Sequence, residues 1–437
     1  MSERAATAQV TAEDEVVDLL ADLIRIDTSN PTRPERPAAE WVAAKLDEVG
    51  IVSQIIEAEP GRASTLARIE GSDSSRAPLL IHGHLDVVPA DAGEWSVDPF
   101  AGEIRDGYVW GRGAIDMKDM DAMVLALVRE WARTGRKPPR DIVLAFVSDE
   151  EAGGRQGAHY LVDHHRDLFA DCSEAISEVG GFSITLDAST RLYLIQTAEK
   201  GINWLRLRAT GRPGHGSMVH DDNAVTRLAA AVSRIGAHEF PIVFTDTVRA
   251  TIEGIAEVTG MALDPDQVDR WLPKLGGAAR MIGATIRNTA NPTMLEAGYK
   301  ANVIPSRAEA TVDARFLPGE EDSLLAAIDE LIGDDVVREF LVRDIAVETS
   351  FDGALVDAMS AALRAEDPGA HPLPYLMSGG TDAKSFSTLG MRCFGFSPLL
   401  LAPELDFMSL FHGIDERVPV DGLKFGVRVL DRLLASC

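Results

Sequence analysis

Two residues with metal-binding or orienting chemistry, His84 and Asp86, follow a short apolar run. The run Leu79-Leu80-Ile81 is typical of a buried strand, and residues two positions apart on a strand point to the same face. We therefore expect His84 and Asp86 to emerge side by side where the strand ends. A metal-bound imidazole usually donates its second ring N–H to a carboxylate or a carbonyl, so this pair could supply a ligand and its orienting group. A purely structural hydrogen bond is the alternative.

Acidic residues follow two further apolar runs. The run Ile142–Val147 has the continuous apolar character of a strand in a parallel sheet, and it leads into Ser148-Asp149-Glu150-Glu151. The shorter run Ala175-Ile176-Ser177 leads into Glu178. Functional groups of open α/β sheets gather at the carboxyl ends of strands, so these acids are candidates for chemistry. An exposed acidic turn is the alternative.

Five potential metal ligands occupy such positions. Two histidines and three carboxylates suffice for two zinc ions if one carboxylate bridges them, and the absence of thiolates is typical of an open, catalytic site. Glu150 is then left over, and a carboxylate beside a metal-bound water that is not itself a ligand can act as a general base. The five candidate ligands are His84, Asp116, Glu151, Glu178 and His412.

Composition and charge restrict the class of protein. The chain of 437 residues is longer than the chains that usually fold around a single hydrophobic core, which predicts two domains. Asp and Glu number 69 against 42 Lys and Arg, and the resulting charge of −27 repels phosphate backbones and acidic membrane surfaces, so we expect no nucleic-acid or membrane partner. Three scattered cysteines form no Cys-x-x-Cys pair, and the amino terminus has no apolar core of signal-peptide length. These features predict a cytoplasmic protein.

The hydrophobic pattern predicts an α/β fold with an insertion. Amphipathic helices alternate with buried strands up to Gln196, after which residues 203–209 alternate polar and apolar like a half-exposed strand. The first pattern returns at Phe351. We therefore predict a catalytic domain formed by residues 1–197 and 351–437, with a smaller domain inserted at 198–350. The helices expected in the catalytic domain span residues 13–26, 36–49, 120–134, 157–169 and 351–364.

Other site types fit the sequence less well. Gly111-Arg112-Gly113 lacks the third glycine of a dinucleotide-binding loop. The sequence contains no Gly-x-Ser-x-Gly elbow of a serine hydrolase and no His-Glu-x-x-His helix of a single-zinc protease. A non-catalytic, metal-dependent binding protein remains an alternative, although such a protein has no need of a free base like Glu150.

Six motifs occur along nearly the whole chain. They are His84-x-Asp86-x-x-Pro89, Gly111-Arg112-Gly113-x-x-Asp116-x-Lys118, Asp149-Glu150-Glu151-x-Gly153, Glu178 before paired glycines, Gly214-His215-Gly216-Ser217 and the late His412. In this order they resemble the co-catalytic zinc exopeptidase and amidohydrolase family of aminoacylase, carboxypeptidase G, carboxypeptidase S, acetylornithine deacetylase and succinyl-diaminopimelate desuccinylase. The resemblance implies a mixed sheet flanked by helices, with an inserted α+β lid or dimerisation domain.

The resemblance also implies roles for the candidate ligands. Asp116 would bridge two Zn²⁺ ions, for which Co²⁺ or Mn²⁺ could substitute. Glu151 and His412 would complete one site, and His84 and Glu178 the other. Asp86 would orient His84, and Glu150 would be the base. Because Val179 separates Glu178 from the paired glycines, Glu174 is a second candidate for that ligand.

Three residues of the smaller domain acquire roles by the same resemblance. His215 is similar to a lid histidine that reaches the active site from a partner subunit and stabilises the oxyanion, which implies a homodimer. Asn291 would contact the substrate, and Arg315 would bind its carboxylate, which suits the planar guanidinium fork. A turn cap and a surface salt bridge are the alternatives for His215 and Arg315. Residues 237–286 form a longer segment than in compact members, as in the carboxypeptidase S branch.

The predicted activity is hydrolysis of an amide or peptide bond next to an amino acid with a free carboxylate. Glu at position 178 resembles carboxypeptidase-like and deacylating members, whereas many dipeptidases have Asp there. The expected substrate is a small N-acyl amino acid or a short peptide. A dipeptidase, or a deacetylase or desuccinylase of amino-acid biosynthesis, is the alternative.

Overall fold

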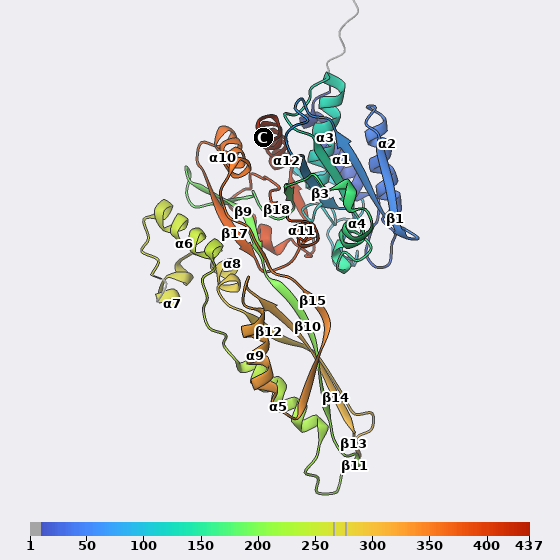
Figure 1. The fold of residues 1–437 in the computed structure, drawn as a ribbon, viewed down its shortest axis with the longest axis vertical. Helices are drawn as coiled ribbons and strands as arrows, with labels where there is room; N and C mark the ends of the chain where they lie inside the picture. Colours follow the sequence, from blue (N-terminus) through green and yellow to red (C-terminus); the bar gives the residue numbers. More distant parts are fainter. Residues whose placement is uncertain (1–9, 265–266, 276–277) are drawn as a thin grey trace, which may run out of the picture. The chain divides into compact units, whose positions relative to one another are not determined.

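The computed structural model describes residues 10–264, 267–275 and 278–437 (Figure 1). These residues divide into two compact units. The first contains the described chain up to Gln196 together with Phe351–Leu373 and Thr381–Cys437, and the second contains Thr197–Ser350 and Pro374–Gly380. Residues 374–380, which the sequence pattern assigned to the catalytic domain, therefore cluster with the second unit.

The first unit is built on a mixed sheet, as the sequence predicted. Four neighbouring strands, β6, β3, β7 and β18, run parallel, and His84 at the end of β3 is opposite Val147 at the end of β6. Antiparallel strands lie on both sides of this group, in the order β1-β2-β6-β3-β7-β18-β9. The strands are β1 (Ser53–Glu59), β2 (Arg62–Ile69), β3 (Leu79–His84), β6 (Ile142–Val147), β7 (Glu174–Ser177), β8 (Ser183–Thr185), β9 (Arg191–Glu199), β17 (Ala370–Met377) and β18 (Arg392–Gly395), with a separate small sheet of β4 (Glu103–Arg105), β5 (Tyr108–Trp110) and β19 (Arg417–Pro419).

Helices cover both faces of this sheet because β3 is apolar on both faces. Leu80 packs in one cluster with Leu161 of α4 and Phe386 of α11. On the opposite face, a Cβ at Gly83 would lie 2.3 Å from the Asp121 carboxylate of α3, so a larger residue at position 83 would require that side chain to move. The helices are α1 (Ala12–Ile24), α2 (Arg36–Asp47), α3 (Lys118–Thr134), α4 (Ala158–His164), α10 (Ala354–Glu366), α11 (Ala383–Ser387) and α12 (Val420–Ser436), with 3-10 turns η1 (Glu150–Ala152), η2 (Arg166–Leu168) and η5 (Phe407–Ser409).

Local sequence signals explain where several helices begin and end. Thr11 and Asp14 form a reciprocal capping box at the start of α1. Gly135 ends α3 in the left-handed conformation, with φ of 70°. The helix expected over 157–169 is shorter, because α4 ends at His164 and the separate turn η2 follows.

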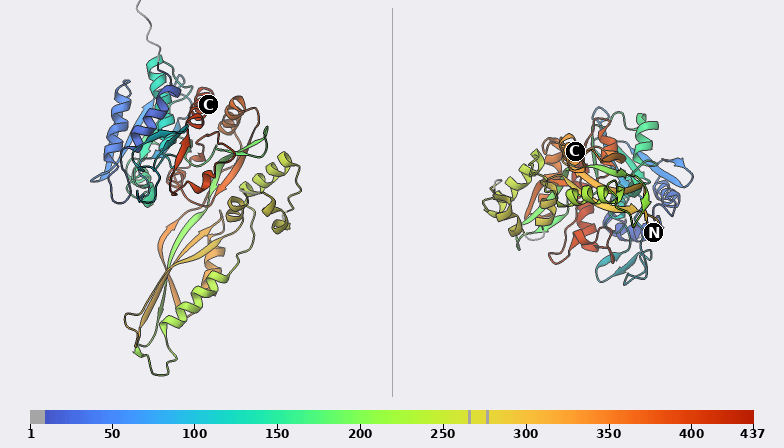
Figure 2. Two further views of the ribbon diagram at one scale, coloured as in Figure 1. Left: turned by 180° about the vertical axis from the view of Figure 1, so that it is seen from behind. Right: turned by 90° about the horizontal axis from the view of Figure 1, so that it is seen from below.

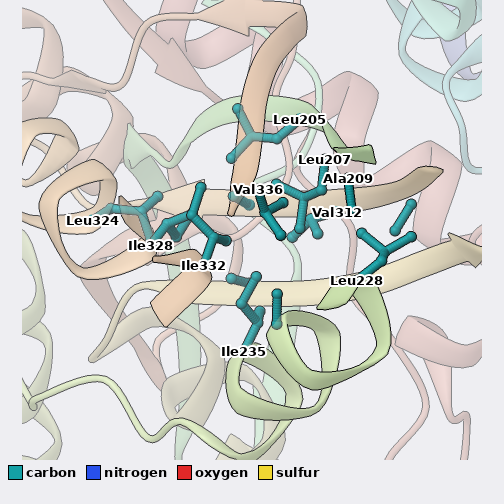
Figure 3. Packing of buried hydrophobic residues seen from close by; sticks show 14 of the residues in the cluster. Leu205, Leu207, Ala209, Leu228, Ile235, Val312, Leu324, Ile328, Ile332 and Val336 are labelled. Atoms are coloured by element: carbon teal, nitrogen blue, oxygen red, sulfur yellow. The ribbon is translucent and has the colours of Figure 1, made fainter. Parts of the chain in front are cut away.

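The second unit is an antiparallel sheet of order β12-β14-β10-β15 with two helices packed on one face. Alternation on β10 directs Leu205, Leu207 and Ala209 towards helices α5 and α9, where they meet Leu228 and Ile328 (Figure 3). This burial fixes the strand register, since a shift by one residue would expose the apolar set. The elements are β10 (Gly201–Thr210), α5 (Ala224–Ala237), β12 (Thr289–Ala297), β14 (Arg307–Phe316), α9 (Glu321–Ile332) and β15 (Val336–Asp344).

Smaller elements complete the second unit. A two-stranded ribbon, formed by one strand just after β10 and one just before β14, continues from that end of the sheet (Figure 2). The described residues of the long segment expected over 237–286 form three α-helices and one 3-10 turn. Thr251 of the first helix donates from its hydroxyl to the Pro374 carbonyl at 2.8 Å. The remaining elements are β11 (Gly214–His215), β13 (Val303–Ile304), β16 (Val347–Glu348), α6 (Asp246–Thr259), α7 (Val268–Trp271), η4 (Leu272–Leu275) and α8 (Ala278–Thr285).

Candidate dinuclear metal centre

The five candidate ligands converge at the carboxyl ends of the parallel strands. His84 is the last residue of β3, Glu151 lies in the turn after β6, and Glu178 directly follows β7. Asp116 and His412 come from the loops before α3 and β19. The three strand ends are neighbours because β6, β3 and β7 are adjacent and parallel, so their following residues meet at one edge.

The ligand atoms form two groups that share Asp116. In the first group, His84 Nε2 lies 3.2 Å from Asp116 Oδ1 and 3.4 Å from Glu178 Oε2. In the second, His412 Nε2 lies 3.2 Å from Asp116 Oδ2 and 3.3 Å from Glu151 Oε2. Within each group the ligand atoms all lie within 4.8 Å of one another. Asp116 therefore offers one oxygen to each group, as a bridging carboxylate requires.

Electrostatic interactions in the metal-free protein keep protons on the imidazoles. Hydrogen bonds to Asp116 and Glu151 raise the pKa of His412 to about 10. Burial alone would lower the pKa of His84, but the charge of Glu178 and the hydrogen bond to Asp116 outweigh it and raise that pKa well above the usual value. Burial raises the pKa of Glu178 to about 7. The carboxylates thus create a site that favours positive charge.

The donor sets fit divalent metal ions. Each group combines one imidazole nitrogen with two carboxylates and contains no thiolate, which is typical of catalytic zinc sites. His84, Asp116 and Glu178 are each less than a tenth exposed, so the cost of burying their charges would be offset by a bound cation. Oε1 of Glu151 is buried without a hydrogen-bond partner among the described residues, and it is a further potential metal-binding oxygen.

Glu150 belongs to neither group, although its carboxylate lies near His84. Its Oε2 lies 3.9 Å from His84 Nε2. Burial, and next the charge of Glu178, raises the pKa of Glu150 well above the usual carboxyl value. A nearby carboxyl group whose proton is held more tightly than usual can exchange that proton with a reacting group.

Asp86 differs in detail from the expectation. The Nδ1 atom of His84 lies 2.9 Å from the main-chain carbonyl oxygen of Asp86, but 3.7 Å from the carboxylate. The carboxylate instead accepts the main-chain N–H groups of Glu150 and Glu151, each at 3.1 Å. Asp86 therefore touches the imidazole through its carbonyl group and holds the acidic turn through its side chain.

Glu174, the second candidate for the ligand after β7, lies away from these groups. Its carboxylate pairs with Arg140 at 2.9 Å, and it occupies the first residue of β7, whereas Glu178 follows the last. The ligand groups contain Glu178.

The three candidates of the smaller domain lie in the second unit, where two of them are neighbours. Asn291 is opposite Asp313 in the β12–β14 pair, and Asp313 binds Arg315 through two hydrogen bonds of 2.7 and 3.1 Å. His215 lies in the β11–β13 ribbon, where its Nδ1 is 2.8 Å from the Ser217 hydroxyl.

His215 and Arg315 are at opposite ends of the second unit's sheet. Arg315 is opposite Ile202 at the start of β10, whereas Arg307 is opposite Thr210 at its end, just before the ribbon. Arg315 and Arg307 are eight positions apart, which corresponds to about 26 Å at about 3.3 Å per residue. The structure therefore does not bring His215 and Arg315 of one chain together.

Sequence reasoning missed several buried polar residues around the two ligand groups. Asn30 lies in a segment without periodic apolar residues, and Asp149 precedes Glu150 without a predicted role. Asp382 and Glu416 are not among the predicted site residues. Glu416 follows the ligand His412 by four residues, and Asp382 follows paired glycines, so both have weak signals in the sequence. Asp382 is 5% exposed, and its Oδ2 has no hydrogen-bond partner among the described residues.

Glu416 supports the loop that carries Asp116. Its carboxylate accepts hydrogen bonds from the main-chain N–H groups of Gly113, Ile115 and Asp116, at 3.0, 2.8 and 3.3 Å. It also pairs with Arg112 at 2.7 Å. One buried carboxylate therefore fixes the backbone immediately before the bridging ligand.

The fold is a mixed sheet flanked by helices, and its site contains two ligand groups joined by one carboxylate, with an additional glutamate beside them. These features are typical of a hydrolase that uses a pair of metal ions. The sequence matches the Peptidase family M20/M25/M40 over residues 80–436, and the chain belongs to this family. The family resemblance in the sequence is thereby confirmed, and the protein is a metal-dependent hydrolase of amide or peptide bonds.

Individual relatives agree with this assignment. The chain is 29% identical to N-fatty-acyl-amino acid synthase/hydrolase PM20D1 of Xenopus tropicalis, over 97% of this chain and 86% of that protein. It is 28% identical to aminoacylase-1 of Sus scrofa, over 96% of this chain and 94% of that protein. The solved M20 family metallo-carboxypeptidase Sso-CP2 from Sulfolobus solfataricus has a similar fold, with a TM-score of 0.73 at 18% identity, covering 97% of this chain and 99% of that chain.

No helix in the described part of the chain combines the length and the apolar character needed to cross a bilayer.

Proposed function

We propose that the protein hydrolyses the amide bond of N-acyl amino acids, releasing a carboxylic acid and an amino acid with a free carboxylate. The observation that carries this proposal is the arrangement of Asp116 and Glu150. Asp116 offers one oxygen to each ligand group, whereas Glu150 lies beside His84 and belongs to neither group. This separation supports different roles for the two carboxylates, with Asp116 as a metal ligand and Glu150 as the base.

Two cations at these groups would polarise the amide carbonyl and lower the pKa of a water molecule towards neutrality. The residues that would hold them are His84, Asp116 and Glu178 for one ion, and Asp116, Glu151 and His412 for the other. Because the ligands are nitrogen and oxygen atoms without thiolates, we propose zinc, with cobalt or manganese as substitutes.

Glu150 would move the proton in this reaction. Its carboxylate takes a proton from the attacking water as the new C–O bond forms. It then donates that proton to the amide nitrogen as the C–N bond breaks. The position of Glu150 supports both steps, because a carboxylate beside the ligand groups that is not itself a ligand is free to take up and give back one proton.

Arg315 and Asn291 would recognise the carboxylate of the substrate. Asp313 engages Nε and Nη2 of Arg315, which fixes the guanidinium plane and leaves Nη1 without a partner among the described residues. Asn291 of β12 lies on the same face of the sheet as Arg315 of β14, diagonally next to it. A fixed guanidinium beside an amide is suited to a planar carboxylate.

His215 would act from a second copy of the chain. Since His215 and Arg315 lie at opposite ends of one sheet, a substrate that contacts both must take them from two chains. We therefore propose a homodimer in which His215 stabilises the oxyanion in the partner's site.

Mixing two inactive variants tests this arrangement. Glu150→Gln and His215→Ala chains, unfolded and refolded together, should recover roughly a quarter of the wild-type activity, because one site of each mixed dimer is intact. Recovery of no activity from confirmed mixed dimers would contradict the role of His215 across subunits.

Two further observations support the substrate class and the location. The names of two relatives, aminoacylase-1 and N-fatty-acyl-amino acid synthase/hydrolase, refer to acyl groups on amino acids, which favours an acyl amino acid over a peptide. Cys172, Cys393 and Cys437 are buried free thiols, which favours a reducing, cytoplasmic location.

A substrate panel with zinc-loaded protein tests the activity. The panel contains acetyl, octanoyl and palmitoyl derivatives of several amino acids, a set of dipeptides, and matched N-acyl amines that lack the carboxylate. We expect turnover of acyl amino acids and little turnover of the matched amines. Equal turnover of both would contradict carboxylate recognition, and no turnover of any amide would contradict the proposed function.

A further inference from the structure

Asn30 is held beside the end of β3 by main-chain pairing. Its N–H donates to the Val87 carbonyl at 2.9 Å, and the Val87 N–H donates to the Thr28 carbonyl at 3.2 Å. The Thr28 hydroxyl also donates to the Leu85 carbonyl at 2.7 Å. These contacts align residues 28–30 with the segment that follows His84, and Asn30 is only 5% exposed.

The side-chain amide of Asn30 joins two carboxylates. Nδ2 donates to Asp86 Oδ2 at 2.8 Å and to Asp149 Oδ1 at 3.1 Å, so each of its hydrogens serves one carboxylate. The opposite orientation of the amide would turn its oxygen towards both carboxylates. Oδ1 of Asn30 has no hydrogen-bond partner among the described residues, so the two donor contacts determine the orientation of the amide.

Both carboxylates in turn hold the acidic turn after β6. Asp86 accepts the main-chain N–H groups of Glu150 and Glu151, each at 3.1 Å. Asp149 accepts the N–H of Gln156 at 2.9 Å across the same turn. Asp149 also has a positive φ of 69°, a backbone conformation that needs support from surrounding contacts.

The chemistry of this position favours a neutral group with two donors. Asp86 and Asp149 are both buried, and their oxygens converge on one point, where an acid would add repulsion and an apolar residue would leave oxygens unpaired. A lysine or arginine would add a positive charge beside a site that must attract cations. Asparagine supplies two N–H groups without changing the charge.

We propose that Asn30 is a positioning residue for Glu150: its amide locks Asp86 and Asp149, and these two carboxylates hold the turn that aims Glu150 at the reacting water. In the described part of the chain, the side-chain amide of Asn30 contacts Asp86 and Asp149, which belong to neither ligand group. The catalytic part of this inference depends on the proposed function, whereas the structural part concerns the turn alone.

Hydrogen exchange tests the structural part without any substrate. In Asn30→Leu, which removes both donors at nearly constant size, the amide hydrogens of Glu150 and Glu151 should exchange at least about tenfold faster than in the wild type, because their acceptor Asp86 is no longer fixed. Asn203→Leu is the matched control. Asn203 is also buried and donates from Nδ2 to Glu321 at 3.1 Å, and its Oδ1 has no hydrogen-bond partner among the described residues. Its side-chain hydrogen bond is with Glu321 and not with Asp86 or Asp149.

Steady-state kinetics at saturating zinc test the catalytic part. Asn30→Leu should lower kcat by about 10- to 100-fold with little change in KM, as is typical for groups that orient active-site residues. The loss should vanish in a Glu150→Gln background, because the effect passes through Glu150. Asn203→Leu should keep the wild-type kcat.

Asn30→Asp is a second variant of identical shape in case Asn30→Leu fails to fold, and it should reproduce the faster exchange. Unchanged exchange at Glu150 and Glu151 in a folded Asn30 variant would overturn the proposal, as would an unchanged kcat in an active enzyme. If the wild type cleaves no amide but the exchange still increases, the proposed function fails while the role of Asn30 in holding the turn stands.

Discussion

Glu416 and Arg112 form a buried ion pair, with 2.7 Å between Oε2 and Nη1. The same carboxylate accepts the main-chain N–H of Asp116. Glu416→Gln would leave the guanidinium without its countercharge and remove an acceptor from the loop. We expect a loss of about 3–5 kcal/mol in the free energy of unfolding, together with weaker binding of both metal ions. Urea titration in the presence of a chelator measures the first effect, and chelator competition measures the second.

A second ion pair, with a buried carboxylate and a partly exposed guanidinium, provides the control for Glu416. Asp367 pairs with Arg191, accepts the Tyr193 hydroxyl at 2.9 Å and accepts the Gly369 N–H at 2.9 Å, but it has no contact with the ligand loops. Asp367→Asn should cost a similar free energy of unfolding and leave metal affinity unchanged. Equal loss of metal affinity in both variants would show that the effect at Glu416 is only general destabilisation.

Removing the carboxylate of Glu150 should abolish turnover while metal binding persists. General acid–base groups contribute about 10²–10⁴-fold to rates, so kcat of Glu150→Gln should fall by at least about 100-fold. Metal content, measured by elemental analysis, should stay at two ions per chain because Glu150 is in neither ligand group. Glu174→Gln, at the other end of β7, should keep kcat and metal content. A Glu150 variant with most of its activity would remove this residue from the mechanism.

The shared position of Asp116 predicts unequal effects of ligand removal. His412→Ala disables only the group that contains Glu151, so one tightly bound ion per chain should remain in the group of His84 and Glu178. Asp116→Ala removes a ligand from both groups and should lower the affinity for both ions. Metal analysis after dialysis distinguishes these results, and equal stoichiometry for the two variants would contradict the bridging role of Asp116.

Metal affinity should increase with pH. In the metal-free protein His412 keeps its proton below a pKa of about 10, and a metal ion needs the neutral imidazole. The proton therefore competes with the metal at neutral pH, and the competition weakens as pH rises. Between pH of about 6 and about 8, affinity should rise about tenfold per pH unit for each proton displaced. Calorimetry in two buffers should detect proton release on binding, and pH-independent affinity would contradict this prediction.

Replacing Arg315 by lysine should weaken substrate binding. Lysine cannot keep the two-point contact with Asp313 or present a planar fork, so KM for an acyl amino acid should increase about 10- to 100-fold with a smaller change in kcat. Arg307→Lys is the matched control, because Arg307 also lies on β14 and pairs with a carboxylate two residues away, Glu309. Similar KM values for both variants would exclude a special role for Arg315.

The strand ends could be predicted because the apolar runs are local signals. Ile142–Val147 is a strand as predicted, and β3 extends the expected run from Leu79 to His84. Parallel pairing then brings the residues that follow these strands to one edge. The sequence positions of Glu150, Glu151 and Glu178 after apolar runs were sufficient to single them out.

The supporting residues could not be predicted because their partners are distant in the sequence. Asn30 meets Asp86 across 56 residues, and Glu416 meets Arg112 across 304 residues. No periodicity relates such positions, since the contacts depend on how loops fold over strand ends. For the same reason the sequence suggested that Asp86 orients His84, but not that its side chain would hold the turn of Glu150 and Glu151.

The ligands of the two groups lie far apart along the chain, and this separation determines the order in which metal ions can be acquired during protein synthesis. A nascent chain that has emerged past Glu178 already holds every side chain of one ligand group. The other group needs His412, which lies 234 positions after Glu178 in the chain. The side chains of the second ion's site would therefore come together only after the whole intervening segment had been synthesised, so the two ions would be acquired in sequence, the one held by His84, Asp116 and Glu178 first.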